Sequence, residues 1–178
     1  PQQTALAYAA GIIDGEGCLR IVKAAPYRSD MHSPSYSGSI QVGMSDPRPP
    51  EMLKEMFGGS IYKERTRFRP IYRWRTNSKR QILICLKKIS PFLVVKKQQA
   101  EVLSTFLKAL KPWYSGNHAP LSDNELAFRE EAYLTMRQLK KSEVAASTEC
   151  EDPERGCDSQ TPEETLGELN ESRLRQSA

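Results

Sequence analysis

Apolar residues recur along the first part of the chain at two different spacings, which predict alternating helices and strands. Residues 5–13 contain no charged side chain and follow Thr4, a suitable N-cap, so they predict a buried helix that ends near Asp14. The apolar run at 18–22 and the alternating stretch Ser39-Ile40-Gln41-Val42 have the length and composition of strands. This order, one helix followed by two strands, is the first half of a repeated pattern.

The same order returns further along the chain. Pro49 begins a predicted helix that runs to Phe57, and a basic hairpin over residues 63–75 follows. Helices are then predicted from about Ser78 to Ile89 and from Lys96 to about Leu110. Helix, two strands, helix, two strands and helices predict an α+β fold, in which helices cover one face of an antiparallel sheet. The other face of the sheet is left free.

Charge divides the chain into unequal parts. The net charge is +4, but residues 143–178 contain ten acidic residues and three arginines, so residues 1–142 carry +11. The acidic segment has few large apolar groups and is predicted to be a disordered tail. A capping box at 122–125 predicts one more helix to about Lys141, whose expected role is packing on the flank of the domain. The expected divisions are therefore 1–112, an extension at 113–142, and the tail at 143–178.

Composition also restricts the setting in which the protein acts. No run of eighteen apolar residues and no secretory signal pattern is present, so we expect an intracellular protein of cytoplasm, nucleoid or organelle, with no membrane partner and no secretion. The four cysteines lack the spacing of a metal site and are expected to be reduced thiols.

The basic hairpin has too many cations on one ribbon for an ordinary solvated sheet, because like charges facing one another destabilise it. Two strands hinged near Arg69-Pro70 are predicted, with Tyr72 and Trp74 pointing to the core. A two-stranded ribbon fits the major groove of DNA, where arginine pairs with guanine. The predicted DNA-binding surface therefore consists of the hairpin cations and three residues of the preceding strands: Lys63, Arg65, Arg67, Arg69, Arg73 and Arg75, with Arg20, Lys23 and Gln41.

The end of the first helix is electrically unusual. Asp14 and Glu16 lie where the helix dipole is already negative, and Gly15 and Gly17 bracket Glu16 on what we predict to be a strained turn. Such an end favours a bound cation, and oxygen ligands suit Mg²⁺. Ala7, Ala10, Gly11 and Asp14 share one stripe of this helix, which would let a second helix approach closely. The alternative is an ordinary core helix with a glycine C-cap.

Residues 9–17, Ala-Ala-Gly-Ile-Ile-Asp-Gly-Glu-Gly, resemble the LAGLIDADG motif of homing endonucleases. The segment from Ser90 to Ala100 is similar to the second signature of that family, and the resemblance extends over about 4–112, which is then the endonuclease domain. It implies an αββαββα fold whose four-stranded sheet forms a saddle over double-stranded DNA. Because the chain carries one motif, it implies a homodimer that acts on a long, roughly palindromic target.

The resemblance also implies the chemistry. Metal-dependent hydrolysis of both DNA strands is expected, with Mg²⁺, or Mn²⁺ in its place, bound by Glu16 and the carbonyl group of Gly15. Lys96 matches the family's lysine near the scissile phosphate, and Arg48 approximately matches a basic residue of the site. Asp14 is expected to brace the helix interface. Met44 departs from the family's usual polar residue; Ser45 or Asp46 could replace its function.

Two other functions are compatible with the same residues. One is an intron-splicing maturase, whose partner is its own intron RNA, as expected of an intron-encoded mobile element. The other is a DNA-binding regulator without nuclease activity, which the departure at Met44 favours. The retained carboxylate at Glu16 favours the nuclease.

Overall fold

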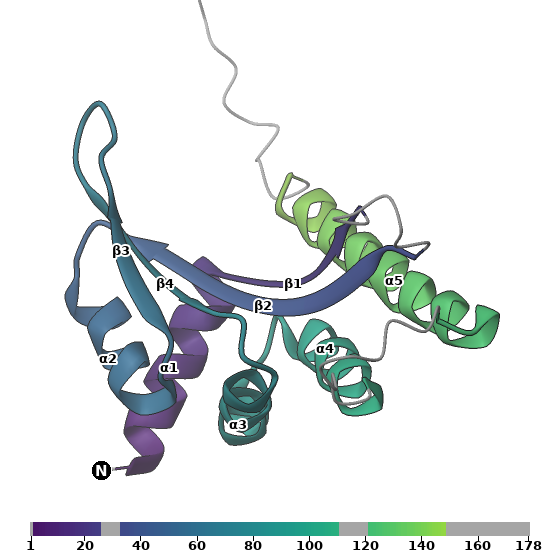
Figure 1. Cartoon of the computed structure of the whole chain (residues 1–178). Coiled ribbons are helices and arrows are strands. Elements are labelled where there is room, and N and C mark those ends of the chain that lie inside the picture. Colours follow the sequence, from purple (N-terminus) through teal and green to yellow (C-terminus); the bar gives the residue numbers. More distant parts are fainter. Residues whose placement is uncertain (1, 26–32, 111–120, 149–178) are drawn as a thin grey trace, which may run out of the picture.

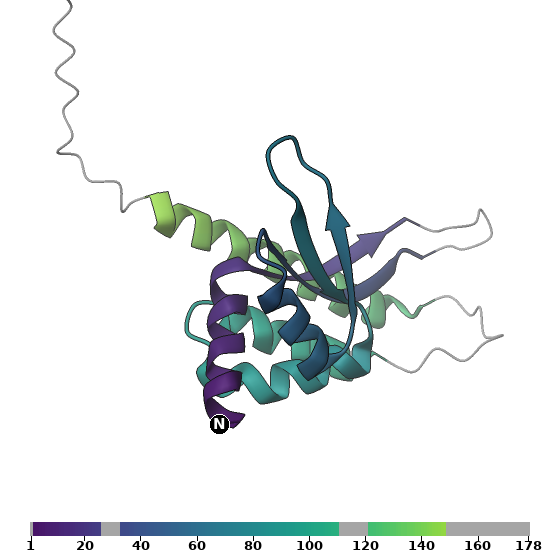
Figure 2. The same cartoon turned by 90° about the vertical axis from the view of Figure 1, so that its left-hand side faces the viewer.

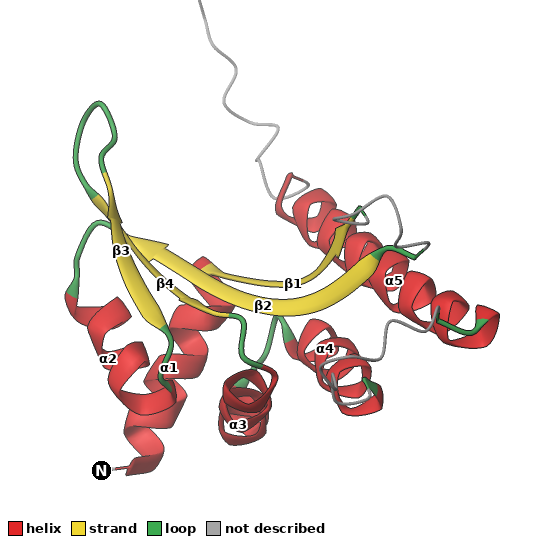
Figure 3. Ribbon diagram, viewed as in Figure 1, coloured by secondary structure: helices red, strands yellow, loops and turns green. Residues whose placement is uncertain are grey.

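Helices and strands alternate in the order that the sequence pattern predicts. The structure, a computed structural model, describes residues 2–25, 33–110 and 121–148. Its elements, drawn in Figures 1 and 3, are α1 (Gln2–Glu16), β1 (Gly17–Ala24), β2 (Ser35–Met44), α2 (Arg48–Phe57), β3 (Ser60–Glu64), β4 (Ile71–Thr76), α3 (Lys79–Ile89), the 3-10 turn η1 (Ser90–Phe92), α4 (Lys97–Ala109) and α5 (Asp123–Thr148). None of the helices in these ranges is long and apolar enough to cross a membrane.

The four strands form one antiparallel sheet in the order β1-β2-β4-β3. Helices α1 to α4 lie on one side of the curved sheet and leave its concave side open, while the loop between β3 and β4 rises on that open side (Figures 1 and 2). The predicted α+β fold, an αββαββα saddle with its helices on the opposite face, is therefore confirmed.

The core fills the space between the sheet and the helices. Trp74 of β4 is fully buried, and its Nε1 donates a hydrogen bond to the carbonyl oxygen of Gly58 at 2.8 Å. Gly58 and Gly59 follow α2 with φ angles of +76° and +94°, which glycine adopts without strain. A Cβ atom on Gly59 would also lie 2.7 Å from the carbonyl oxygen of Arg75. These two glycines let α2 pass into β3 directly beneath the indole ring.

Helix α1 continues two residues beyond the predicted end and passes into β1 without a loop. The predicted strained turn at Gly15 and Gly17 is wrong, because among the glycines of the described part of the chain only Gly58 and Gly59 have positive φ angles. Gly17 is needed for another reason. A Cβ atom there would lie 2.3 Å from the carbonyl oxygen of Ile13, so no larger residue fits where the helix meets the strand.

Helix α5 packs beside α4 and along the edge strand β1. Its Met136 is only 2% exposed, which agrees with the packing role expected from the sequence, and the hydroxyl group of Ser122 accepts a hydrogen bond from the N–H of Glu125 at 3.4 Å. The helix extends to Thr148, so the predicted boundary at residue 143 falls inside a helix. The remainder of the predicted acidic tail lies outside the described residues.

The two cysteines within the described ranges are free thiols, as expected. Cys85 is buried in α3, and this burial raises the pKa of its thiol to about 12, so the side chain is uncharged at neutral pH. Cys18 is half-buried on β1. Its sulfur lies 3.1 Å from the Nζ of Lys140, which belongs to α5.

Candidate active site and nucleic-acid interface

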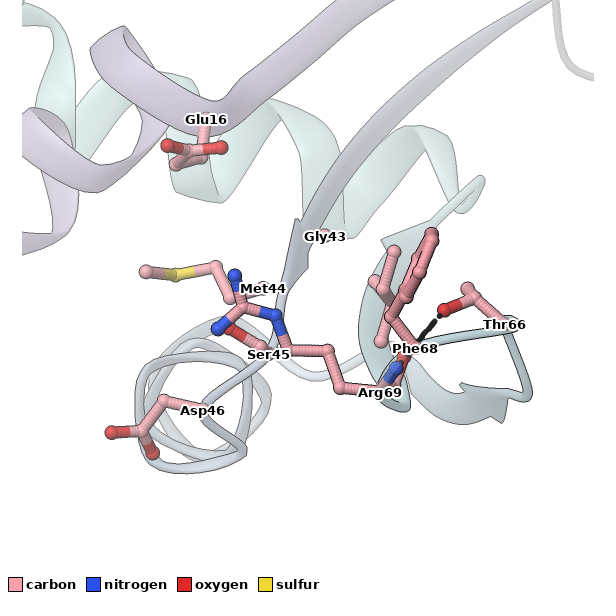
Figure 4. Close-up of a pocket in the computed structure, with 9 residues that line it drawn as sticks. Glu16, Gly43, Met44, Ser45, Asp46, Thr66, Phe68 and Arg69 are labelled. Carbon is pink, nitrogen blue, oxygen red and sulfur yellow. Dashed lines mark hydrogen bonds between the residues drawn. The ribbon is translucent and has the colours of Figure 1, made fainter. Parts of the chain in front are cut away.

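Glu16 is the last residue of α1, and its side chain is exposed at the end of the helix. It makes no hydrogen bond or ion pair with any residue that the structure describes. Its carboxylate borders a pocket of about 380 Å³ between α1, the end of β2 and the hairpin loop (Figure 4). The pocket is lined by Glu16, Gly43, Met44, Ser45, Asp46, Thr66, Phe68, Arg69 and Ile71.

Asp14, one half-turn before Glu16, is held by the backbone of another element. Its carboxylate accepts hydrogen bonds from the N–H groups of Val94 at 2.7 Å and Lys96 at 2.9 Å, with a longer one from Val95 at 3.4 Å. These N–H groups belong to the three residues directly before α4, which begins at Lys97, and negative charge is favoured at this end of a helix. Asp14 therefore fixes the segment that leads into α4 within its own chain, a role that the sequence did not indicate.

Lys96 lies at the same end of α1. Its Nζ donates a hydrogen bond to the main-chain oxygen of Asp14, so the lysine side chain and the aspartate side chain each bind the other residue's backbone. Two residues that are 82 positions apart in the sequence are thereby locked together. The fold thus brings the predicted catalytic lysine to the end of the helix that carries Glu16.

Arg48, the third predicted catalytic residue, forms an ion pair with Asp46 on the other side of the pocket. Its backbone N–H and its guanidinium group both donate to the Asp46 carboxylate. The backbone nitrogen lies 3.0 Å from one carboxylate oxygen, and Nε lies 3.0 Å from each of the two. These bonds lower the pKa of Asp46 to about 2. The side-chain hydrogen bonds from Arg48 contribute most, and the bond from its backbone N–H comes second. Asp46 lines the pocket of Glu16, whereas the Arg48 side chain is 85% exposed and is not among the residues that line it.

The donor atoms at the end of α1 suit a hard divalent cation but do not complete its coordination. Glu16 supplies an exposed carboxylate, and the exposed Gly15 next to it has open space where a side chain would otherwise lie. Carboxylate and carbonyl oxygens are the ligands that Mg²⁺ prefers. No group of three acidic, histidine or cysteine side chains suitable for a metal occurs in the described ranges. Further ligands would have to come from a second chain, from DNA or from water.

The open face of the sheet, the one turned away from α1 to α4, carries three of the predicted DNA-binding arginines. Strand register places Arg20 opposite Ser39, Gln41 opposite Arg75, and Gly43 opposite Arg73, all on this face. Arg20 donates to the side-chain oxygen of Gln41 at 3.1 Å, which ties the predicted Arg20 and Gln41 together. The open face therefore presents cations and an amide over its two central strands and β1.

Acidic and polar side chains hold two of these arginines in place. Glu64 pairs with Arg73, so the hairpin is less uniformly basic than its run of cations indicates. The Nε of Arg75 donates to Asn77 at 2.9 Å. These bonds fix guanidinium groups toward the open side without removing their positive charge.

Two lysines predicted to bind DNA lie on the other face. Lys63 pairs in register with Tyr72, next to the buried Trp74, and its Nζ lies 5.5 Å from the centre of the Tyr72 ring. Lys23 pairs with the buried Tyr36 and forms an ion pair with Glu130 of α5 at 2.7 Å. The prediction was wrong in placing them on the same surface as Arg20, Arg73 and Arg75, because side chains alternate between the two faces of a strand.

Three more predicted cations belong to a loop. Strand β3 ends at Glu64, so Arg65, Arg67 and Arg69 lie in the loop 65–70 instead of along one strand face. The hydroxyl group of Thr66 donates to the carbonyl oxygen of Arg69 at 2.6 Å and closes this loop. The guanidinium group of Arg69 extends into the pocket of Glu16 (Figure 4), a juxtaposition that the alternating pattern did not reveal.

The small-residue stripe predicted for α1 divides between the core and the surface. Ala10 is fully buried in its own chain, and Asp14 is half-buried beside the start of α4. Ala7 and Gly11 are exposed, and Tyr8 next to them is 55% exposed. The exposed part of α1 therefore lies around Ala7, Tyr8 and Gly11, and the prediction that the whole helix is buried was wrong.

The fold and the site together define a class of protein: a single αββαββα unit with an open, arginine-bearing sheet face and a carboxylate at the end of its first helix. No family model matches the sequence, and no curated protein is similar to it at a significant level. Solved structures do match. All those reported below are homing endonucleases.

The homing endonuclease I-CvuI, in complex with a DNA target in the presence of Mg, matches with a TM-score of 0.57 and 18% identity over 78% of this chain and 82% of that chain. The homing endonuclease I-TnaI matches with a TM-score of 0.54 and 19% sequence identity, over 79% of this chain and 96% of that chain. The LAGLIDADG homing endonuclease I-GzeII, in complex with a DNA target, matches with a TM-score of 0.54 and 17% sequence identity, over 93% of this chain and 53% of that chain. The chain has the LAGLIDADG homing endonuclease fold, and the resemblance indicated by residues 9–17 is confirmed.

Proposed function

We propose that this protein is a site-specific endonuclease that cuts double-stranded DNA with the aid of a divalent metal. The observation that carries this proposal is the placement of Glu16. An exposed carboxylate without a partner among the described residues ends a helix directly beside the open, arginine-bearing face of the sheet. A carboxylate so placed is costly next to the negative end of a helix unless a cation binds it.

DNA would lie in the saddle formed by the open face. Arg20, Arg73 and Arg75, with Gln41, would contact base edges in the major groove, where guanidinium and amide groups distinguish base pairs. The loop that contains Arg65, Arg67 and Arg69 rises on the same side of the sheet (Figure 2), and these arginines would contact phosphates. The affinity for DNA is then expected to fall steeply with salt, because each neutralised phosphate releases counterions.

A second copy of the chain would complete the site. The exposed surface around Ala7, Tyr8 and Gly11 lets two α1 helices approach closely because small side chains keep their backbones near each other. A two-fold axis along this contact would bring two Glu16 side chains together, one for each DNA strand. A two-fold symmetric protein reads a roughly palindromic target.

The residues at the end of α1 have distinct proposed roles. The carboxylate of Glu16 and the main-chain carbonyl oxygen of Gly15 would hold Mg²⁺, with Mn²⁺ as a substitute; when bound, such an ion activates water and stabilises the departing oxygen. Lys96 would place its ammonium group near the phosphate and stabilise negative charge that develops there. Asp46, kept ionised by Arg48, would orient water in the pocket with Ser45.

The test is to replace the Glu16 carboxylate by an amide of the same shape. The wild-type chain is incubated with Mg²⁺ and a library of duplexes of random sequence, and cut ends are sequenced to define the target. We expect Glu16→Gln to lower the cleavage rate on that target roughly 10²–10⁴-fold, which corresponds to several kcal/mol of lost transition-state stabilisation. DNA binding should be retained. Glu55→Gln, on the exposed surface of α2, is the matched control and should cut normally.

Each other outcome identifies a different function. Cleavage by Glu16→Gln at the wild-type rate would show that this carboxylate has no role in the reaction. Sequence-selective DNA binding without cutting by the wild-type chain would favour a regulator on the same fold. Tight binding to structured intron RNA, again without DNA cutting, would favour a maturase.

A further inference from the structure

Phe68 is the most exposed large apolar side chain in the described part of the molecule, with 90% of its surface open to solvent. It lies in the loop 65–70 between Arg67 and Arg69, on the open side of the sheet (Figures 1 and 2). It is not among the side chains that pack against the core. An aromatic ring left in water forgoes the free energy of burial, so its position calls for a partner that covers it.

The loop holds Phe68 out from the protein by bonds on both sides of it. The hydroxyl group of Thr66 donates to the carbonyl oxygen of Arg69 at 2.6 Å, and the N–H of Arg69 donates back to the hydroxyl oxygen at 3.4 Å. The guanidinium carbon of Arg67 lies 5.7 Å from the centre of the Phe68 ring. The ring is thus presented by a closed loop, with the Arg67 guanidinium beside it and the Arg69 guanidinium extending into the neighbouring pocket.

Phe68 also borders the pocket that contains the Glu16 carboxylate (Figure 4). A phosphodiester bond that reaches Glu16 would therefore bring neighbouring nucleotides to the ring. The arginines on either side would bind the phosphates of those nucleotides. DNA-bending proteins insert apolar side chains, phenylalanine among them, as wedges between base steps and so kink the duplex.

We propose that Phe68 inserts at a base step of the bound duplex close to the cleaved bond, partly unstacking the bases there. This inference rests on the proposed function, because it requires a duplex seated on the open face. The flanking Arg67 and Arg69 favour DNA over a second protein chain as the partner that covers the ring. Phe68 would then determine which base steps are accepted at that position, since pyrimidine–purine steps unstack most easily.

The experiment measures unstacking directly. The probe is the duplex recovered from the random library by cleavage or, in the absence of cleavage, by binding to the full chain, with the fluorescent base 2-aminopurine placed at each position in turn. We expect wild-type protein to raise the fluorescence at one step in each half-site. Phe68→Ala should abolish this rise and weaken binding roughly 5- to 150-fold, the range for loss of one base stacked on an aromatic side chain.

Two further variants distinguish stacking from a general defect. Phe68→Trp keeps an aromatic ring and should retain the fluorescence signal. Ile84→Ala removes another exposed apolar side chain, 41% exposed on α3, and should bind like the wild type. Thermal melting of each variant checks folding, which an exposed loop residue is not expected to change.

The outcomes separate this inference from the proposed function. A duplex that is cut normally while no 2-aminopurine position responds, or responds equally to Phe68→Ala, would overturn the inference and leave the nuclease proposal standing. A change in self-association of Phe68→Ala in the absence of DNA, seen by sedimentation, would assign the ring to a protein interface and would also overturn it. Failure of the wild-type chain to bind any duplex would overturn both.

Discussion

Two clusters of polar side chains join distant segments of this molecule, and they differ in the partners that they use. At the end of α1, Asp14 and Lys96 each bind the other residue's backbone. Beside α5, Lys23, Tyr36 and Glu130 bind one another through their side chains alone. Backbone partners are placed by the fold itself, whereas long side chains must be ordered by the bond that they make. The first arrangement therefore fixes a position, and the second mainly tethers a helix.

The difference coincides with the distribution of proposed chemistry. Glu16, the carboxylate that needs a defined position, follows Asp14 by two residues. The cluster at α5 surrounds no unpaired carboxylate in the described residues and adds to the flank of the sheet. Three substitutions test whether partners on the backbone matter more than partners on side chains.

The largest effect is expected at Asp14. Asp14→Ala removes the acceptor for two or three N–H groups in the segment directly before α4, and we expect it to lower the free energy of unfolding by about 1–3 kcal/mol. Urea unfolding followed by circular dichroism measures the change. Glu55→Ala, at an exposed position of α2, is the control and should change stability by less than about 0.5 kcal/mol. Equal stability of the two variants would remove the basis of the comparison.

An intermediate case is the pair of Asp46 and Arg48, which combines one backbone bond with several side-chain bonds. We expect Arg48→Ala to raise the pKa of Asp46 from about 2 part of the way toward its ordinary 3.8, because the backbone N–H of residue 48 still donates. A pH titration of the carboxyl carbon by NMR measures it. Arg80→Ala, on α3, should leave the value unchanged. A full return to 3.8 would show that the backbone bond has no influence.

The smallest effect is expected at Glu130. Hydrogen bonds from Lys23, and then from Tyr36, lower the pKa of Glu130, so its ion pair stabilises the fold above the ordinary pKa of glutamate. That contribution is lost as the pH falls through the lowered pKa. Lys23, whose pKa the same bond raises, loses its contribution only when the pH rises above the ordinary lysine range.

Glu130→Gln should therefore melt at a slightly lower temperature than the wild type near neutral pH, and the two should converge in acid. Differential scanning calorimetry across this range, with Glu131→Gln as the neighbouring exposed control, measures the difference. A loss as large as that of Asp14→Ala would contradict the view that side-chain partners at this surface contribute little.

Local patterns predicted the elements of the fold because each one is marked within its own segment. Pro49 lies in the first turn of α2, which begins one residue earlier at Arg48, the Ser-Pro pair at 90–91 follows the end of α3, and the uncharged run at 5–13 forms most of α1. The sequence also indicated Glu16 and Lys96, and the structure brings both to the end of α1. The periodicity was sufficient for these elements, and the catalytic roles of Glu16 and Lys96 stay predictions.

The sequence failed where a residue's partner lies far away along the chain. The acceptor role of Asp14 depends on N–H groups 80 to 82 positions later, which no local pattern shows. The alternation of cations continues through Arg65 and Arg67 after β3 has ended, because Thr66 closes a loop that the charge pattern does not register. The alternation of side chains along β1 does place Lys23 and Arg20 on opposite faces of the sheet, but the partner of Lys23, Glu130, comes from the distant helix α5.

The loop-free passage from α1 into β1 has a consequence for where a nuclease of this design would cut. Gly17 leaves no spare residue between helix and strand to absorb a rotation, since even a Cβ atom there would collide with Ile13. Glu16 and Arg20 are therefore joined by a short, stiff stretch of chain. If Arg20 contacts a base and Glu16 acts at the cleaved bond, the short chain segment between them fixes the distance along the DNA from that base to that bond. A variant with another residue at position 20 would then recognise a different base but would still cut at the same distance from it.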